Sequence, residues 1–224
     1  MNGPIVLQTR GLYGWKPEFQ NLLRPLSRVL AAGGIRANQI TLLASALSVA
    51  LGLFLAHWTD ARRLFLIVPV FLFLRMALNA IDGMLARDFD QKSNLGAYLN
   101  ELGDVVSDAF CYLPFAYLAE FDPLWIGAVI VLSVISEFAG MVGPMIGASR
   151  RYDGPMGKSD RAFVFGALAL WIGAGGQLGH WVPSLAPKVL ALLLVATIIH
   201  RVRGGLREVE ADQPLVPARS NDGD

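Results

Sequence analysis

Six long apolar stretches dominate this chain of 224 residues and limit what it can fold into. Each is close to the ~20 residues that a helix needs to cross the hydrocarbon of a bilayer. Hydrophobic residues make up 54% of the chain and charged residues 17%, and the mean hydropathy is +0.48. These values indicate a membrane protein rather than a soluble domain. We expect an all-α, polytopic membrane protein with transmembrane helices at 38–58, 62–86, 95–120, 123–147, 159–179 and 185–203.

A different pattern precedes the first apolar stretch. Over residues 16–32, apolar side chains such as Phe19, Leu22 and Leu26 recur at helical spacing, with polar and basic residues between them. This pattern predicts an amphipathic helix in the membrane interface, although a helix packed on a partner would show the same pattern. Pro25 lies inside it and weakens it.

These patterns give three regions. Residues 1–36 form an N-terminal segment with the interfacial helix, and residues 37–207 form the six-helix transmembrane domain. Residues 208–224 are acidic, contain prolines and lack periodicity, so we expect a disordered tail.

The placement of Lys and Arg predicts an orientation, because cytoplasmic flanks carry the excess of positive charge. One side of the six helices collects Arg10, Lys16, Arg24, Arg28, Arg36, Arg87, Lys92, Arg150, Arg151, Lys158, Arg161, Arg201, Arg203, Arg207 and Arg219. The other side has Arg62, Arg63 and Lys188. Both termini and the mouth of the polar site described next are therefore predicted to be cytoplasmic. The net charge of +1 gives no indication of a nucleic-acid partner.

Polar residues interrupt the second and third predicted spans at regular intervals. Ionisable groups at bilayer depth are costly and mark functional sites. On the second span, one helix face carries Arg75, Asn79, Asp82 and Ala86. On the third span, one face carries Gly96, Asn100, Asp104 and Asp108. A short polar turn over 87–94 makes the two helices antiparallel neighbours with facing stripes. Facing oxygen atoms suit a hard divalent cation such as Mg²⁺.

The spacing of these residues resembles the signature of the CDP-alcohol phosphotransferases, integral membrane enzymes also called CDP-alcohol phosphatidyltransferases. The matching pattern is Asn79-x2-Asp82-Gly83-x2-Ala86-Arg87-x8-Gly96-x3-Asn100-x3-Asp104. The family pattern has Asp where this chain has Asn79 and Asn100. Two of the four ligand positions are therefore amides, and the lower ligand charge weakens the expected binding of metal.

The resemblance implies roles for individual residues. It implies a site for one or two Mg²⁺ or Mn²⁺ ions at Asn79, Asp82, Asn100 and Asp104, which Asp108 could extend, and it makes Asp104 the catalytic base. The CDP-linked donor would contact Asn38, Thr41, Gly83, Ala86, Arg87 and Gly96. The acceptor would contact Lys158, Arg161, Arg150 and Arg151.

Several of these residues have simpler interpretations. The polar cluster could be a hydrogen-bonded network that only joins helices. Gly83 could serve close helix packing, Arg87 could interact with the carboxyl end of its helix, and Arg150 could anchor the loop on the cytoplasmic side. Thr41 could be only a helix-start hydrogen bonder. Arg75 stays open between pairing with Asp82 or Asp108 and binding a substrate phosphate.

By resemblance, the chain transfers a phosphatidyl group from a CDP-lipid such as CDP-diacylglycerol to an alcohol and releases CMP, in phospholipid biosynthesis. The acceptor stays open between a phosphorylated alcohol, such as glycerol 3-phosphate or inositol phosphate, and serine, choline or an unusual polyol. We expect residence in the cell inner membrane, and the family is commonly dimeric. The alternatives are a weakened relative that binds CDP-lipid or supports a membrane complex, and an ion carrier, which does not explain the Gly83–Ala86–Arg87 spacing.

Overall fold

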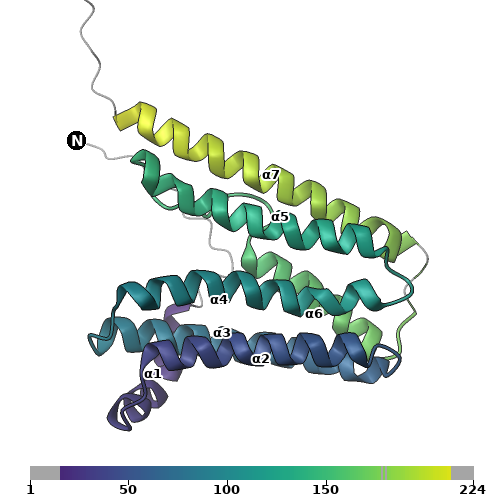
Figure 1. The fold of residues 1–224 in the computed structure, drawn as a ribbon, viewed down its shortest axis with the longest axis horizontal. Coiled ribbons are helices and arrows are strands. Elements are labelled where there is room, and N and C mark those ends of the chain that lie inside the picture. Colours follow the sequence, from purple (N-terminus) through teal and green to yellow (C-terminus); the bar gives the residue numbers. More distant parts are fainter. Residues whose placement is uncertain (1–15, 178, 180, 213–224) are drawn as a thin grey trace, which may run out of the picture. The chain divides into compact units, whose positions relative to one another are not determined.

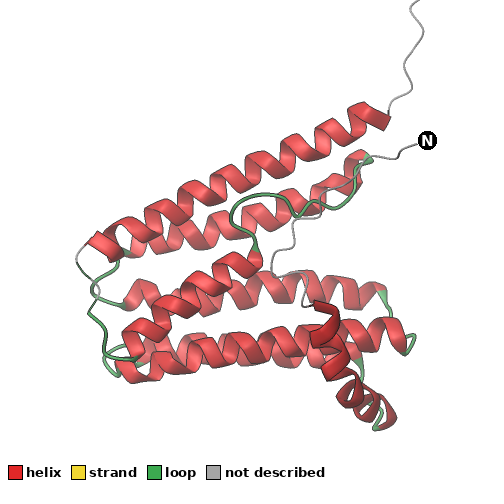
Figure 2. Ribbon diagram, turned by 180° about the vertical axis from the view of Figure 1, so that it is seen from behind, coloured by secondary structure: helices red, strands yellow, loops and turns green. Residues whose placement is uncertain are grey.

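The computed structural model describes residues 16–177, 179 and 181–212, and every regular element in these ranges is helical (Figures 1 and 2). The elements are α1 (Lys16–Ala32), α2 (Ala37–His57), η2 (Arg62–Leu66), α3 (Ile67–Asp88), α4 (Asn94–Tyr112), η3 (Leu113–Tyr117), α5 (Pro123–Val142), η4 (Gly143–Ile146), α6 (Lys158–Gly173) and α7 (Trp181–Asp212). The predicted all-α class is confirmed. The chain divides into two compact units, one of Met1–Val49 and Val70–Ser107 and one of Ala50–Pro69 and Asp108–Asp224.

Within the described ranges, four segments are long and apolar enough to cross a membrane. They are Ala37–His57, Arg62–Asp88, Pro123–Ile146 and Trp181–Ala211. The other two predicted spans correspond to α4 and α6, which form at the expected places. α4 carries the polar stripe with Asn100, Asp104 and Asp108, and α6 has only 16 residues. The structure therefore supports four membrane-spanning segments by length and composition.

Three helix ends differ from prediction by six residues or more. α4 ends at Tyr112, and η3 follows it to Tyr117, whereas the predicted span ran to 120. α6 ends at Gly173 instead of near 179, because a turn follows in which Gly175 has φ +83, a left-handed value that favours glycine. α7 continues to Asp212, so the residues from 208 to 212, predicted as the start of a disordered tail, are helical. The remainder of that tail lies outside the described residues.

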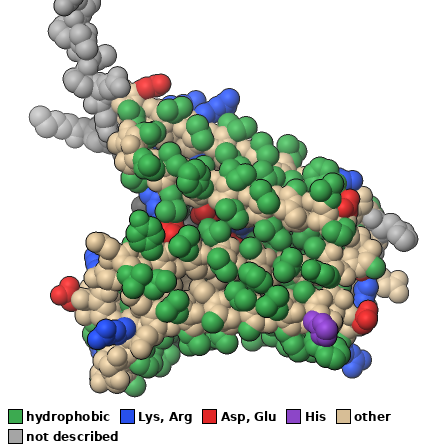
Figure 3. Space-filling model, in the orientation of Figure 1, with side chains coloured by type: hydrophobic (Ala, Val, Ile, Leu, Met, Phe, Trp, Pro, Cys, Tyr) green, Lys and Arg blue, Asp and Glu red, His purple; other side chains and the backbone are tan. Residues whose placement is uncertain are grey.

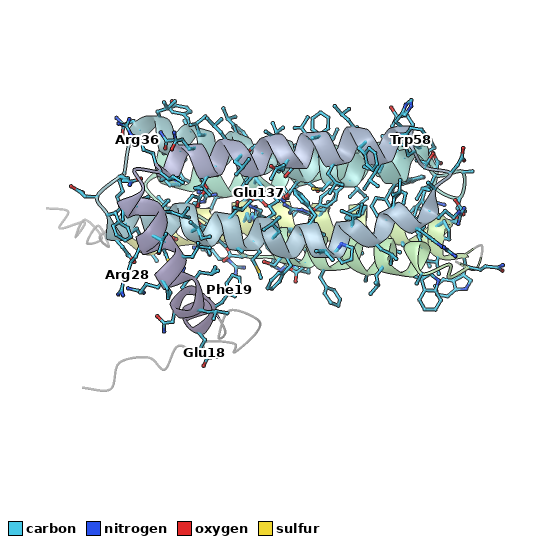
Figure 4. The ribbon with its side chains drawn as sticks, turned by 90° about the horizontal axis from the view of Figure 1, so that it is seen from below. Glu18, Phe19, Arg28, Arg36, Trp58 and Glu137 are labelled. Carbon is cyan, nitrogen blue, oxygen red and sulfur yellow. The ribbon has the colours of Figure 1, made fainter. Side chains whose placement is uncertain are left out.

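α1 divides its apolar residues between two environments. Leu23 and Leu30 pack on the core of the first unit, and Phe19 makes an edge contact with Phe73 at 5.7 Å between ring centroids. Leu22 and Val29 are 75% and 68% exposed. The helix thus offers apolar side chains outward as well as inward, and its outer face is suited to lipid. The labelled residues of Figure 4 show its course from Glu18 to Arg28.

The core of the first unit forms where α2 and α3 meet, and α2, α3 and α4 run side by side in Figure 1. Its buried members are Ala37, Ile40, Ile81, Met84 and Leu85. These residues recur three or four positions apart on each helix, which places them on one face. Arg75 and Asn79 lie on another face of α3, from which they contact Asp104 of α4.

The second unit has an aromatic core. Tyr112 stacks on Phe165 with ring centroids 4.0 Å apart, and Phe115 makes edge contacts with Phe65, Phe121 and Phe165. In the same unit α5 and α7 lie side by side (Figure 1). Large aromatic side chains bury much apolar surface in few residues, so this packing fixes the helices of the unit against one another.

Apolar side chains cover much of the visible face of both units in Figure 3. Highly exposed apolar side chains occur on different helices: Val70, Phe138 and Leu192 are 69%, 66% and 69% exposed. A soluble protein rarely exposes so continuous an apolar surface. The exposed faces are therefore suited to acyl chains rather than to water.

Candidate active site

Asp104 on α4 is joined to two residues of α3. The side-chain nitrogen of Asn79 donates to Oδ1 of Asp104 at 3.1 Å. Nη2 of Arg75 donates to the main-chain oxygen of Asp104 at 3.1 Å and lies 3.4 Å from its Oδ1. The prediction that the two polar stripes face each other is consistent with these contacts. Asp104 is thus one partner of Arg75.

Asp82 is buried, with 6% of its surface exposed. The hydroxyl of Thr41 donates to its Oδ2 at 2.7 Å and to the main-chain oxygen of Ala37 at 3.2 Å. Thr41 is thus more than a helix-start hydrogen bonder, because it orients a carboxylate of the neighbouring helix.

The oxygen atoms of this region can be tested against a divalent cation. Asp82 and Asp104 offer carboxylates, and the half-buried Asn79 and Asn100 carry amides. No three His, Cys, Asp or Glu side chains gather around a common point in the described part of the chain. The donor chemistry fits Mg²⁺ or Mn²⁺, which accept carboxylate and amide oxygens together with substrate phosphates. With two carboxylates, phosphate oxygens of a bound donor would have to complete the coordination.

The loop before α4 is bound to the start of α2. The main-chain nitrogen of Ala37 donates to Oε1 of Gln91 at 2.7 Å, and the side-chain nitrogen of Asn38 lies 3.5 Å from the hydroxyl of Ser93. Ser93 also accepts from the main-chain nitrogen of Gly96 at 2.9 Å, which caps α4. A Cβ at Gly96 would stand 2.7 Å from Oδ1 of Asn38. Gly96 is therefore required for the close approach of Asn38.

Arg87 folds back over Gly83 on the same helix. A Cβ at Gly83 would stand 3.1 Å from Nη1 of Arg87, so the missing side chain makes room for this guanidinium. Arg87 itself is exposed at the end of α3, where it can reach a phosphate. Ala86 packs on the core of the first unit, which agrees with the packing interpretation for that residue.

Asp108 belongs to the second unit, where it takes part in a buried group of four charged side chains. Arg161 is fully buried and donates to Asp108 and Glu137, at 2.9 Å in each case. Arg201 is 2% exposed, lies 3.4 Å from the other carboxylate oxygen of Glu137 and donates to the main-chain oxygen of Ser136. Two cations and two anions from α4, α5, α6 and α7 thus balance each other.

The other expected acceptor residues lie in or beside the loop before α6. Arg151 binds Asp153 at 2.6 Å and Glu208 at 2.6 Å, and the Arg150 guanidinium lies 5.0 Å from the ring centre of Tyr152. Hydrogen bonds to Asp153 and Glu208 raise the pKa of Arg151 above its ordinary value against the opposing effect of burial. Lys158 opens α6 and is half-buried. The loop is therefore less cationic than its sequence suggests.

Sequence reasoning missed Gln91 and Ser93, and it missed the ion pair between the half-buried Glu137 and the buried Arg201. Glu137 lies within an apolar stretch, so the rule that flagged Asp82 could have flagged it as well. Ser93 precedes a helix, where a capping side chain is expected. A surface hollow lined by residues 60–64 and 172–175 contains none of the predicted site residues.

Comparison with known proteins agrees with the signature. The model of the CDP-alcohol phosphatidyltransferase family matches residues 35–202. The inner membrane protein YnbA of Escherichia coli K12 is 44% identical over 195 residues, which cover 87% of this chain and 96% of YnbA. An uncharacterized protein of Aquifex aeolicus VF5 is 28% identical over 84% of this chain and 90% of its own length.

Two solved structures share the fold at 19% identity, both of Mycobacterium tuberculosis phosphatidylinositol phosphate synthase (PgsA1). One has CDP-DAG bound and a TM-score of 0.70, covering 85% of this chain and 96% of that one. The other is a complex with manganese and citrate, with a TM-score of 0.67 and coverage of 85% and 92%.

Proposed function

Because the chain belongs to the CDP-alcohol phosphatidyltransferase family, we propose that it transfers a phosphatidyl group from a CDP-lipid to an alcohol and releases CMP. The observation that carries this proposal is the pair of oriented carboxylates, with Asp104 held by Arg75 and Asn79 and Asp82 held by Thr41. Binding of CDP-DAG by the similarly folded PgsA1 supports CDP-diacylglycerol as the donor.

A divalent cation, Mg²⁺ or Mn²⁺, would be held by Asp82 and Asp104 with the amides of Asn79 and Asn100. The manganese complex of PgsA1 supports this assignment. When bound, such an ion neutralises charge on the pyrophosphate oxygens during phosphoryl transfer. One or two ions are compatible with the family, and the shortage of carboxylates favours the smaller number.

The CDP moiety would lie along the start of α2 and the facing ends of α3 and α4. Gly83, Ala86 and Gly96 lack bulk there, and Asn38 and Arg87 offer donors to the nucleotide and its phosphates. Thr41 would contribute by fixing Asp82.

Asp104 would act as the base. The acceptor oxygen attacks the phosphorus of the lipid-linked phosphate, its proton passes to the Asp104 carboxylate, and the bond to CMP breaks. Asn100 is excluded from this role because an amide does not take up a proton near neutral pH. The acceptor would contact Lys158, Arg150 and Arg151. Arg161 is fully buried and donates to Asp108 and Glu137, so the implied acceptor contact does not extend to it.

A second candidate is a weakened relative that binds CDP-lipid without efficient turnover. The contact that favours it is the Asn79 amide on Asp104, because a neutral donor stands there in place of a further anionic ligand. Release of CMP distinguishes this candidate from an active transferase.

In the membrane, we propose that α4 and α6 also cross, which completes six spans, with both termini and the site mouth on the cytoplasmic side of the cell inner membrane. The polar stripe of α4 has partners within the protein, so its charged residues need not face lipid. A homodimer, common in the family, would be compatible with the exposed apolar faces.

The test is release of CMP from radiolabelled CDP-diacylglycerol with a panel of alcohols and Mg²⁺. Asp104→Asn should lower the rate by about 100-fold or more, the usual contribution of a general base, while the protein elutes normally from size exclusion. Asp88→Asn is the matched control, because Asp88 is part of an exposed ion pair with Arg24. Unchanged activity of Asp104→Asn would remove Asp104 from the base role, and CDP-lipid binding without CMP release would favour the second candidate.

A further inference from the structure

Arg75 is a buried cation of α3 that contacts the proposed base, Asp104, but has no step of its own in the proposed transfer. Only 4% of its surface is exposed. A buried guanidinium is costly at bilayer depth unless anionic or carbonyl oxygens receive it. Nη2 donates to the main-chain oxygen of Asp104 at 3.1 Å and lies 3.4 Å from its side-chain Oδ1.

Asn79 reinforces this arrangement. It lies one helical turn after Arg75, on the same face of α3, and its amide nitrogen donates to the same Oδ1 of Asp104. One carboxylate oxygen is thus approached by a cationic donor and by a neutral donor. This is the environment that a bound cation would otherwise provide for a carboxylate in a low-dielectric site.

The number of carboxylates in the site also bears on how many cations it can bind. Two carboxylates, Asp82 and Asp104, serve the proposed cation, and no three acidic or metal-binding side chains gather in the described ranges. If Arg75 balances Asp104, one carboxylate charge and the donor phosphates remain for metal. A single divalent ion matches that charge better than two.

We propose that Arg75 is an internal cation: with the Asn79 amide it fixes Asp104 and balances its charge, so that the site takes a single divalent ion. This inference rests on the proposed function for the metal. Arg75 is a positioning residue in this scheme, since it acts through Asp104. It also accounts for the amide at position 79, because a carboxylate at that distance from Asp104 would repel it.

The test compares Mn²⁺ binding by purified protein, measured from the signal of free Mn²⁺ in electron paramagnetic resonance. The full chain should bind one ion. Asn79→Asp places two carboxylates together but keeps Arg75, whereas Asn79→Asp/Arg75→Gln removes the internal cation. We expect the double variant to bind Mn²⁺ about tenfold or more tightly than Asn79→Asp, within the range that outer-shell groups change metal affinity. Asn79→Asp/Arg75→Lys, which keeps a charge, should lie between them.

Activity gives a second readout. Arg75→Gln should lose CMP release, and Arg75→Lys should recover part of it, whereas Arg28→Gln, at an exposed position of α1, should leave it unchanged. Equal Mn²⁺ affinity in Asn79→Asp and the double variant, in protein that elutes as a folded species, would overturn the internal cation. If the double variant does not fold, two bound ions in the wild-type chain would overturn it equally. Absence of CMP release in the wild type together with the expected Mn²⁺ result would instead reject the transferase and keep the internal cation.

Discussion

Thr41 shows how a single hydroxyl can matter at the residue scale. Its bond to Oδ2 of Asp82 is 2.7 Å long and buried, and it joins the first helix of the signature region to a carboxylate of the next. Loss of a buried donor leaves the acceptor short of a partner, at about 1–3 kcal/mol.

We therefore expect Thr41→Val to reduce CMP release by about 5- to 150-fold, the kinetic equivalent of that free energy. Thr41→Ser keeps the hydroxyl and should stay within about threefold of wild type. Mn²⁺ affinity, measured on the same samples, should fall in Thr41→Val alone. Full activity of the valine variant would mean that the orientation of Asp82 is set by other contacts.

The sequence predicted which residues share a face but not which of them meet. Helical spacing placed Arg75, Asn79 and Asp82 on one stripe of α3, and Asn79 indeed contacts Asp104. Arg75 was open between Asp82 and Asp108, because spacing along two helices says nothing about how far one is shifted along the other.

At the scale of the elements, the buried ion group of Arg161, Arg201, Asp108 and Glu137 connects four helices. The family resemblance implied that Arg161 contacts the acceptor. The residue lies in the first turn of α6, where a loop and a helix are hardest to tell apart from sequence, and the helix turns its side chain inward. Its charge is balanced within the protein, so it contributes little to the positive flank used for orientation.

Replacing Arg161 alone should lower the stability of the protein more than replacing Arg161 and Asp108 together. We expect Arg161→Gln to lower stability by about 3–5 kcal/mol, because the buried carboxylate of Asp108 loses a cationic partner. Arg161→Gln/Asp108→Asn should recover part of this loss. Thermal unfolding in detergent measures both, with Arg203→Gln as an exposed control on α7. Equal stability of the single and double variants would contradict the charge argument.

At the scale of the whole molecule, the distribution of Lys and Arg predicts the side on which each helix end lies. Arg36 and Trp58 flank α2 at opposite ends (Figure 4). By the positive-inside rule we expect the Arg36 end in the cytoplasm. The excess of positive charge on that side persists when the buried Arg161 and Arg201 are left out of the count.

This orientation can be measured with single cysteines in a chain whose only cysteine, Cys111, is replaced by alanine. Trp58→Cys should react with a membrane-impermeant maleimide in bacterial spheroplasts. Arg36→Cys should react only after the membrane is permeabilised. The opposite pattern would invert the topology and place the site mouth outside.

The number of spans was less predictable than the number of helices. Asn100 and Asp104, which belong to the proposed site, make α4 less apolar than a typical membrane span. Glycines that follow Gly173 end α6 early. A hydropathy average over a predicted span does not distinguish a uniformly apolar helix from one that also carries polar site residues. In the described ranges, four segments are apolar enough to span a membrane, and α4 and α6 are of mixed character.

The 16 residues of α6 have a consequence for the surrounding lipid. At a rise of about 1.5 Å per residue they reach about 24 Å, which is shorter than the hydrocarbon thickness of ~30 Å. A bilayer around a membrane-crossing α6 would have to thin locally, at a cost of a fraction of a kcal/mol per Å. Acyl chains of shorter length would relieve this deformation, so the protein would be sensitive to the same class of molecule that it is proposed to help make.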